Sequence, residues 1–386
     1  MKNRLAGRLV VIAIAWFLFL CLFNYFAQKE GMDEGYILNN IKELSIPQLF
    51  GQLKFDQVFP RVYLASISLL AGQFSYCWLA LRFLPLLFML LGFFIWVYLY
   101  KLESKNNFFW FLLIFSFASS IFTSYYAAQL KQYSGDLFVV AFYTLFIYYQ
   151  RKYLSGSASI KYLWLFSLFA PLLILFSHMS FLMLGMVVYN YAFLLKKDKR
   201  SWAPFSAYLI ITFAVALFVL LFDIRYSLGI KFMQDYWRNC FIDTRSPYAF
   251  IKTFSNGLQN IFVRWFLEKS FTKSIAAIFM PFALVALFLG FKASWRKYQG
   301  AVMDLNLICG VLLLELFVLG VFKVYVFSGA RITMFIAPFI FYLIVRGIYL
   351  TEKTKFLFLS LLGLYLVFLS GVSTYLFFFY LKFYRG

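Results

Sequence analysis

The stretch that decides the fold is LVVIAIAWFLFLCLFNYFA at residues 9–27, an apolar run without a charged side chain. A helix rises 1.5 Å per residue, so about 20 apolar residues cross the hydrocarbon core of a bilayer. The run follows a basic N-terminal stretch that ends at Arg8, and no small-residue cleavage site comes after it. We therefore expect a retained first transmembrane helix rather than a signal peptide.

Similar apolar segments recur along the rest of the chain. They lie at about 80–100, 108–127, 135–150, 162–177, 180–195, 203–223, 274–291, 301–322, 331–348 and 356–380. Counting the run at 9–27 as the first, the third to sixth segments (108–127 to 180–195) are short for a full crossing. We therefore expect them to be tilted or interrupted. The sequence predicts an all-α polytopic membrane protein, with one domain over residues 1–386 and about eleven transmembrane helices.

Composition supports this fold class. The chain is 64% hydrophobic and 13% charged, whereas soluble domains are about 45–50% apolar and about 25% charged. The net charge of +21 comes from short basic clusters between the apolar runs, which indicates topology and contact with membrane lipids rather than nucleic-acid binding. Four cysteines without a CxxC motif and a single histidine predict no disulfide framework and no multi-histidine metal site.

The basic clusters also predict an orientation. They recur in alternate loops, beginning with Lys2, Arg4 and Arg8, so these loops and the N-terminus are expected in the cytoplasm. With eleven spans, the C-terminus would then lie outside. The other side carries two long segments, at about 28–79 and 224–273, that are rich in Asp, Tyr, Trp and Arg. Because binding and catalytic residues gather on loops held by a rigid scaffold, we expect these outer segments to cover an active site.

Asp33 and Glu34 are adjacent carboxylates just past the first predicted helix, in QKEGMDEGY at residues 28–36. Neighbouring carboxylates at a membrane surface repel one another, which makes the pair a candidate source of a general base for a hydroxyl nucleophile. An ordinary solvated loop would show the same residues. Both interpretations stay open at this point.

Several other polar residues fall at the predicted outer ends of spans. Lys131 and Asp136 lie in AAQLKQYSGD at residues 127–136, and Arg331 opens the tenth span. Lysine and arginine can hold a phosphate, and ionisable groups at membrane depth are functional candidates. Simpler roles are a carboxylate at a helix N-terminus for Asp136, a head-group anchor for Arg331 and a packed side chain for His178. Glu315, inside the ninth span, is given no role.

The order of several motifs resembles one known family. The motifs are PRVYL at 60–64, LALRFLP at 79–85, QLKQYSGD at 129–136, Ser177-His178, and FSGARITMF at 327–335. Together with Asp33-Glu34 they resemble the dolichyl-phosphate-mannose–protein mannosyltransferase superfamily, in particular bacterial members related to the lipid A aminoarabinose transferase. Gln129 departs from the bacterial motif, which has Glu at that place.

The resemblance implies a GT-C fold and a sugar donor carried on a polyprenyl phosphate. It implies that Asp33 is the general base, and that Glu34 binds the acceptor or positions the base. Lys131 and Arg331 would hold the lipid phosphate and stabilise its developing charge. Further candidate substrate-binding residues on this likeness are Tyr36, Tyr63, Gln132, Tyr133, Asp136 and His178.

These features predict an inverting glycosyltransferase of the plasma (inner) membrane whose active site faces outward. Its acceptor would be a lipid, a glycan or a protein. No dedicated metal site is expected, although the sequence leaves room for a weakly held Mg²⁺ or Mn²⁺ at Asp33 and the donor phosphate. Two other functions remain open: a transporter or flippase for a lipid-linked sugar, and a polysaccharide polymerase or ligase that uses a diphosphate-linked donor.

Overall fold

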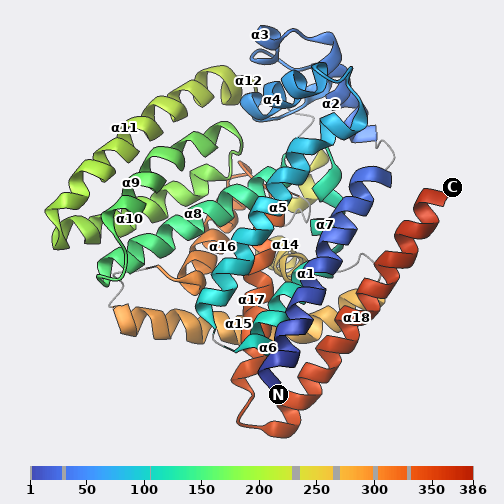
Figure 1. The fold of residues 1–386 in the computed structure, drawn as a ribbon, viewed down its shortest axis with the longest axis vertical. Coiled ribbons are helices and arrows are strands. Elements are labelled where there is room, and N and C mark those ends of the chain that lie inside the picture. Colours follow the sequence, from blue (N-terminus) through green and yellow to red (C-terminus); the bar gives the residue numbers. More distant parts are fainter. Residues whose placement is uncertain are drawn as a thin grey trace.

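The computed structural model describes residues 2–27, 32–104, 106–227, 235–263, 270–298, 303–327 and 332–385. Throughout these ranges the regular structure is helical, and no β-strand occurs in them. The helices form one bundle (Figure 1). The prediction of an all-α membrane protein is confirmed for this part of the chain.

Each predicted apolar segment contains a helix. They are α1 (Lys2–Ala27), α5 (Trp78–Glu103), α6 (Asn107–Ala118), α8 (Tyr133–Leu154), α9 (Ile160–Phe169), α10 (Ser180–Lys197), α11 (Trp202–Val219), α15 (Ser270–Tyr298), α16 (Leu305–Val321), α17 (Ala337–Leu350) and α18 (Lys355–Arg385). Among the described residues, four helices are long and apolar enough to cross a membrane alone, and a fifth span results if one bent pair counts as one. The number of eleven crossings is therefore not confirmed.

The bent pair belongs to the short third segment. Helix α6 ends at Ala118, and α7 (Ile121–Tyr125) with η2 (Tyr126–Ala128) continues at an angle of 60°. The hydroxyl of Thr123 donates to the carbonyls of Phe117 and Ser120, 2.8 and 2.9 Å away, which adds side-chain hydrogen bonds where the helix breaks. The fifth segment is interrupted as well, where α9 gives way to η3 (Pro171–Leu175) at a proline that lacks an N–H.

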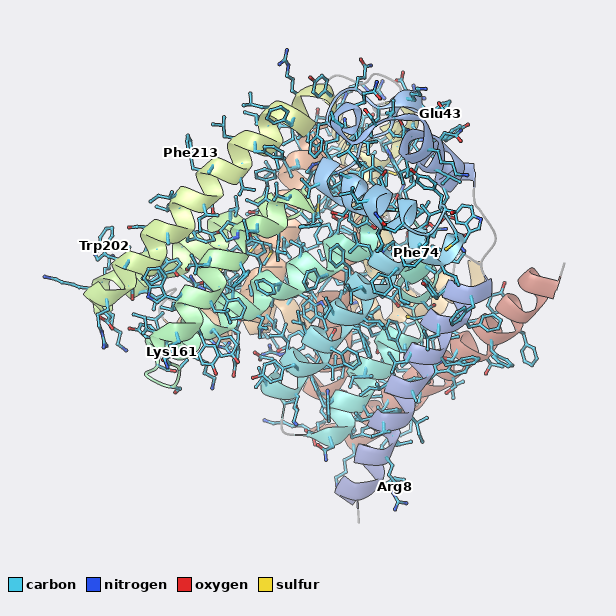
Figure 2. All side chains as sticks on the ribbon, turned by 45° about the horizontal axis from the view of Figure 1, so that its top comes forward. Arg8, Glu43, Phe74, Lys161, Trp202 and Phe213 are labelled. Atoms are coloured by element: carbon cyan, nitrogen blue, oxygen red, sulfur yellow. The ribbon has the colours of Figure 1, made fainter. Side chains whose placement is uncertain are left out.

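The two long outer segments also contain helices. The first holds α2 (Met32–Glu43), α3 (Ile46–Leu49), η1 (Lys54–Asp56) and α4 (Arg61–Gly72), and the second holds α12 (Arg225–Ser227), η6 (Arg238–Cys240) and α14 (Pro247–Val263). Figure 1 shows α2, α3, α4 and α12 gathered at the end of the bundle opposite the N-terminus. Figure 2 likewise separates Glu43, near the top, from Arg8 at the bottom. The first outer segment and α12 of the second thus share one end of the molecule, whereas Figure 1 shows α14 within the bundle, where it packs against α15 and α17.

Glycines allow two pairs of helices to approach closely in the bundle. A Cβ on Gly92 of α5 would lie 2.6 Å from Leu137 Cδ2 of α8, and one on Gly347 of α17 would lie 2.4 Å from the carbonyl oxygen of Phe282 in α15. These helix pairs pack directly on one another. Because no hydrophobic effect drives helices together in lipid, their association depends on van der Waals contacts, which a close approach of the backbones increases. This close approach fixes α8, which carries part of the candidate site at its N-terminal end.

The outward face of α11 remains apolar. Trp202 and Phe213 project from the helix at the edge of the molecule, and Phe213 is 72% exposed (Figure 2). A membrane-spanning helix that presents such side chains contacts lipid. The helix ends in a short π-helix, η5 (Leu220–Ile224), from which Asp223 turns inward and is buried.

Candidate active site

Glu34 joins three parts of the chain at the end of the bundle opposite the N-terminus. It lies in the first turn of α2 and is 1% exposed. Its Oε2 is 3.1 Å from Nη2 of Arg82 on α5, and its Oε1 accepts a hydrogen bond of 3.0 Å from the backbone N–H of Leu130. Arg82 is equally buried and lies over the ring of Trp78 at 4.7 Å. Because buried charges are costly unless paired, this bridge holds α2, α5 and the segment before α8 together.

Two predicted residues of the site cannot be placed in the same detail. The backbone of Asp33 lies in the first turn of α2, next to Glu34, but its side chain lies outside the described residues. Arg331 also lies outside the described residues. Their roles as base and as phosphate ligand therefore stay predictions. The bridge made by Glu34 nevertheless fixes the backbone position from which Asp33 extends.

Lys131 follows Leu130 directly and is half-buried. Its Nζ is 3.3 Å from Oε1 of Gln57 and 5.5 Å from the centre of the Phe59 ring, so its ammonium group faces the stretch that leads into α4. Its carbonyl accepts a hydrogen bond of 3.2 Å from the hydroxyl of Tyr63, on the first turn of α4. A partly buried ammonium group can attract an anion.

Tyr63 connects Lys131 with the buried start of α8. Burial raises the pKa of the Tyr63 phenol well above its ordinary value, and the neighbouring Asp136 carboxylate raises it further. The phenol therefore remains protonated and able to donate. Asp136 itself is buried, and its Oδ1 accepts a hydrogen bond of 2.6 Å from the hydroxyl of Ser177.

A second buried cluster brings Arg61, His178 and Asp223 together. Nε2 of His178 lies 2.7 Å from Oδ2 of Asp223, and the same oxygen accepts the backbone N–H of Arg61 at 3.3 Å. Nε of Arg61 is 3.7 Å from Oδ1 of Asp223, and both of these side chains are at most 3% exposed. Burial lowers the pKa of Arg61, and the carboxylate of Asp223 partly opposes that shift. The three residues come from α4, from the turn before α10 and from η5.

The two groups of residues are continuous. Arg61 and Tyr63 lie on the same turn of α4, and they reach Asp223 and Lys131 respectively. Ser177, which holds Asp136, is the neighbour of His178 in the chain. The predicted residues Lys131, Tyr63, Asp136 and His178 are thus brought to one region.

The remaining predicted residues lie around this region in different surroundings. Tyr36 stacks on Phe55 with ring centres 5.0 Å apart, and Tyr133 is buried edge-on against Tyr126. Oε1 of Gln132 is buried and makes no hydrogen bond within the described part of the chain. That orphaned acceptor marks Gln132 as a further polar group able to take a partner.

Sequence reasoning gave no role to four residues of this region: Gln57, Arg61, Arg82 and Asp223. A signal existed for two of them, because Arg82 and Asp223 are charged residues within apolar segments, and such residues require partners. In the ranges that the structure covers, no three His, Cys, Asp or Glu residues are grouped so that they could hold a metal ion.

Comparison with known proteins identifies the fold. No family model and no curated protein matches the chain. The structure is similar to ArnT from Cupriavidus metallidurans in the apo state, with a TM-score of 0.56, 14% identity and coverage of 89% of this chain but only 60% of that one. It is also similar to ArnT from the same organism bound to undecaprenyl phosphate, with a TM-score of 0.53, 12% identity and coverage of 100% and 76%. As the sequence resemblance predicted, the chain therefore has the GT-C fold of ArnT, the lipid A aminoarabinose transferase.

Proposed function

We propose that this chain transfers a sugar from a polyprenyl-phosphate donor to an acceptor at the outer face of the plasma membrane, with inversion at the sugar carbon. The fold it shares with a lipid-linked sugar transferase supports a reaction of this class. One of the two ArnT structures holds undecaprenyl phosphate. This supports a polyprenyl phosphate as the lipid part of the donor.

The observation that carries the proposal is the bridge through Glu34. This carboxylate ties the helix that carries Asp33 to the N–H of the residue before Lys131. A base and a phosphate-binding cation are thereby anchored to one buried point, which holds catalytic groups in fixed relative positions. Because both oxygens of Glu34 are engaged inside the protein, we assign it the positioning role rather than contact with the acceptor.

In the proposed reaction, Asp33 accepts the proton of an acceptor hydroxyl or amine. The deprotonated oxygen or nitrogen forms a bond to C1 of the sugar while the bond from C1 to the phosphate oxygen breaks. Polyprenyl phosphate leaves with that electron pair. Lys131 and Arg331 would stabilise the negative charge that grows on the phosphate, which is electrostatic preorganisation in a site shielded from water.

Transfer by the purified chain tests this proposal. The chain, in lipid nanodiscs, is given undecaprenyl phosphate that carries glucose, mannose or 4-amino-4-deoxyarabinose, with extracted envelope lipids and glycans as acceptors. Nanodiscs hold no gradient, so turnover there distinguishes a transferase from a transporter. A parallel series with the diphosphate-linked sugars separates the polymerase alternative, and added EDTA tests dependence on Mg²⁺ or Mn²⁺.

Asp33→Asn is the matched test of the base. It should reduce transfer by about 10²-fold or more, within the range of general-base catalysis. Asp243→Asn is the control, since Asp243 lies in the other outer segment and pairs with the exposed Arg245 at 2.6 Å. Full activity of Asp33→Asn would remove Asp33 from the mechanism.

A further inference from the structure

In the cluster of Arg61, His178 and Asp223, the two ring nitrogens of His178 have different surroundings. The proposed reaction does not use this difference. The carboxylate of Asp223 can only accept hydrogen bonds, so the nitrogen of His178 that faces it, Nε2, must carry a proton. The guanidinium of Arg61 balances the charge of that carboxylate at 3.7 Å. Asp223 therefore has two partners, the guanidinium of Arg61 and the Nε2–H of His178.

In the neutral imidazole, a proton on Nε2 leaves Nδ1 as the accepting nitrogen of the ring. Within the described part of the chain, no residue makes a hydrogen bond with Nδ1, and the His178 side chain is 23% exposed. Asp223 and Arg61, by contrast, are buried. The cluster thus offers one hydrogen-bond acceptor, Nδ1, on a partly exposed side chain that is held by buried partners.

An accepting nitrogen discriminates between the parts of the proposed substrate. It repels the ionised oxygens of a phosphate, which are themselves acceptors, and it binds a hydroxyl, which donates. Lys131 provides the cation that suits the phosphate, and α4 links the two residues through Tyr63 and Arg61. Phosphate and sugar would therefore be recognised by different groups on the two sides of the first turn of α4.

We propose that Nδ1 of His178 accepts a hydrogen bond from a sugar hydroxyl of the substrate, and that Asp223, held by Arg61, is the positioning residue that fixes this tautomer. The inference rests on the proposed function, because the hydroxyl belongs to the transferred sugar. It adds a sugar-orienting residue to the groups assigned to base and phosphate.

The chain offers an unusually direct spectroscopic test, because His178 is its single histidine. The protein, purified through a tag without histidine and labelled with ¹⁵N-histidine, gives one imidazole. We expect the proton on Nε2 and a bare Nδ1, with a mixture of tautomers in Asp223→Asn. A proton resident on Nδ1 of the wild type would overturn the proposal. The Nδ1 resonance should move when the undecaprenyl-phosphate sugar that the wild type uses as a donor is added. It should stay in place with undecaprenyl phosphate alone.

Two substitutions separate this role from a purely structural one. The amide of His178→Asn ends where Nδ1 was and retains an acceptor there, whereas the amide of His178→Gln ends where Nε2 was and retains only the contact with Asp223. We expect His178→Gln to lower kcat/KM by about tenfold or more relative to His178→Asn, the loss of one substrate hydrogen bond. Binding of undecaprenyl phosphate should be equal in both. If His178→Gln is the more active variant, His178 serves the structure only, and the proposal is wrong.

Failure of this inference and failure of the proposed function give different results. Absence of transfer by the wild type from every donor would contradict the function itself. Transfer by the wild type with an Nδ1 resonance that ignores the bound sugar would contradict the role of His178 alone. Thermal unfolding of each variant, compared with the wild type, shows whether the loss of activity reflects a loss of folding.

Discussion

The carboxylate of Glu34 accepts the backbone N–H of Leu130 across 3.0 Å, although the two residues are 96 positions apart in the chain. The other oxygen of the same carboxylate pairs with Arg82. One buried side chain thus sets the distance between the first turn of α2 and the start of the segment that leads into α8.

Glu34→Gln should destabilise the protein strongly. It removes the carboxylate that pairs with the buried guanidinium of Arg82, which costs about 3–5 kcal/mol of unfolding free energy. Glu43→Gln, on the same helix, is the control, because Glu43 pairs with Lys54 while about half exposed and such a pair contributes at most about 1 kcal/mol. Unfolding in mixed detergent micelles measures both. Equal losses from the two variants would argue against a special role for Glu34.

Lys131→Met should weaken binding of undecaprenyl phosphate by about tenfold or more, since it removes a charge-assisted hydrogen bond to the phosphate. Lys131→Arg keeps the charge and should retain part of the affinity. Lys54→Met serves as the control, because Lys54 lies in the outer segment whose Gln57 contacts Lys131, and it pairs with Glu43. Binding is measured by native mass spectrometry of the detergent complex. Unchanged binding in Lys131→Met would place the phosphate elsewhere.

Gly347→Ala should disrupt the packing of α17 on α15. The added Cβ would lie 2.4 Å from a backbone oxygen of Phe282, so one helix must shift, at a cost of about 1–3 kcal/mol. Gly363→Ala, in α18, meets no atom within 4 Å and should gain up to about 1 kcal/mol from helix propensity. The two variants are compared by thermal unfolding in one detergent. A stabilised Gly347→Ala would contradict the close helix contact.

The orientation can be tested with native cysteines. Cys77 is exposed in the turn between α4 and α5, whereas Cys21 and Cys309 are buried and Cys240 is half-buried. In a Cys240→Ser background, a membrane-impermeant maleimide should modify Cys77 in intact cells, with the outer membrane opened where one is present. Modification only after the plasma membrane is permeabilised would place this end of the bundle in the cytoplasm. Cys77→Ser in the same background is the control and should show no labelling.

Hydropathy located the helices because a chain in lipid must satisfy its backbone hydrogen bonds within apolar helices of sufficient length. The same pattern indicated the interrupted helices only because their apolar segments were short, and it did not locate the break after Ala118. It could not count the crossings, since α16 and α17 are apolar yet shorter than a full span.

A single sequence does not indicate which charged residues of the site pair with one another. Arg82 needed a partner by its place in an apolar segment, but nothing in the chain indicates which acid, 48 positions away, provides it. Arg61 and Asp223 are 162 positions apart, and only the tertiary structure brings them together. The resemblance predicted Lys131 and His178 as site residues, and the structure adds the residues that hold them.

A cryo-electron microscopy structure of the chain in a nanodisc with undecaprenyl phosphate would locate the lipid phosphate relative to Lys131, Arg331 and Asp33. We expect density for the phosphate beside Nζ of Lys131, with Arg331 on the same phosphate and the carboxylate of Asp33 on the side where the acceptor would bind. A phosphate bound only at the opposite end of the bundle, near Arg8, would contradict this expectation.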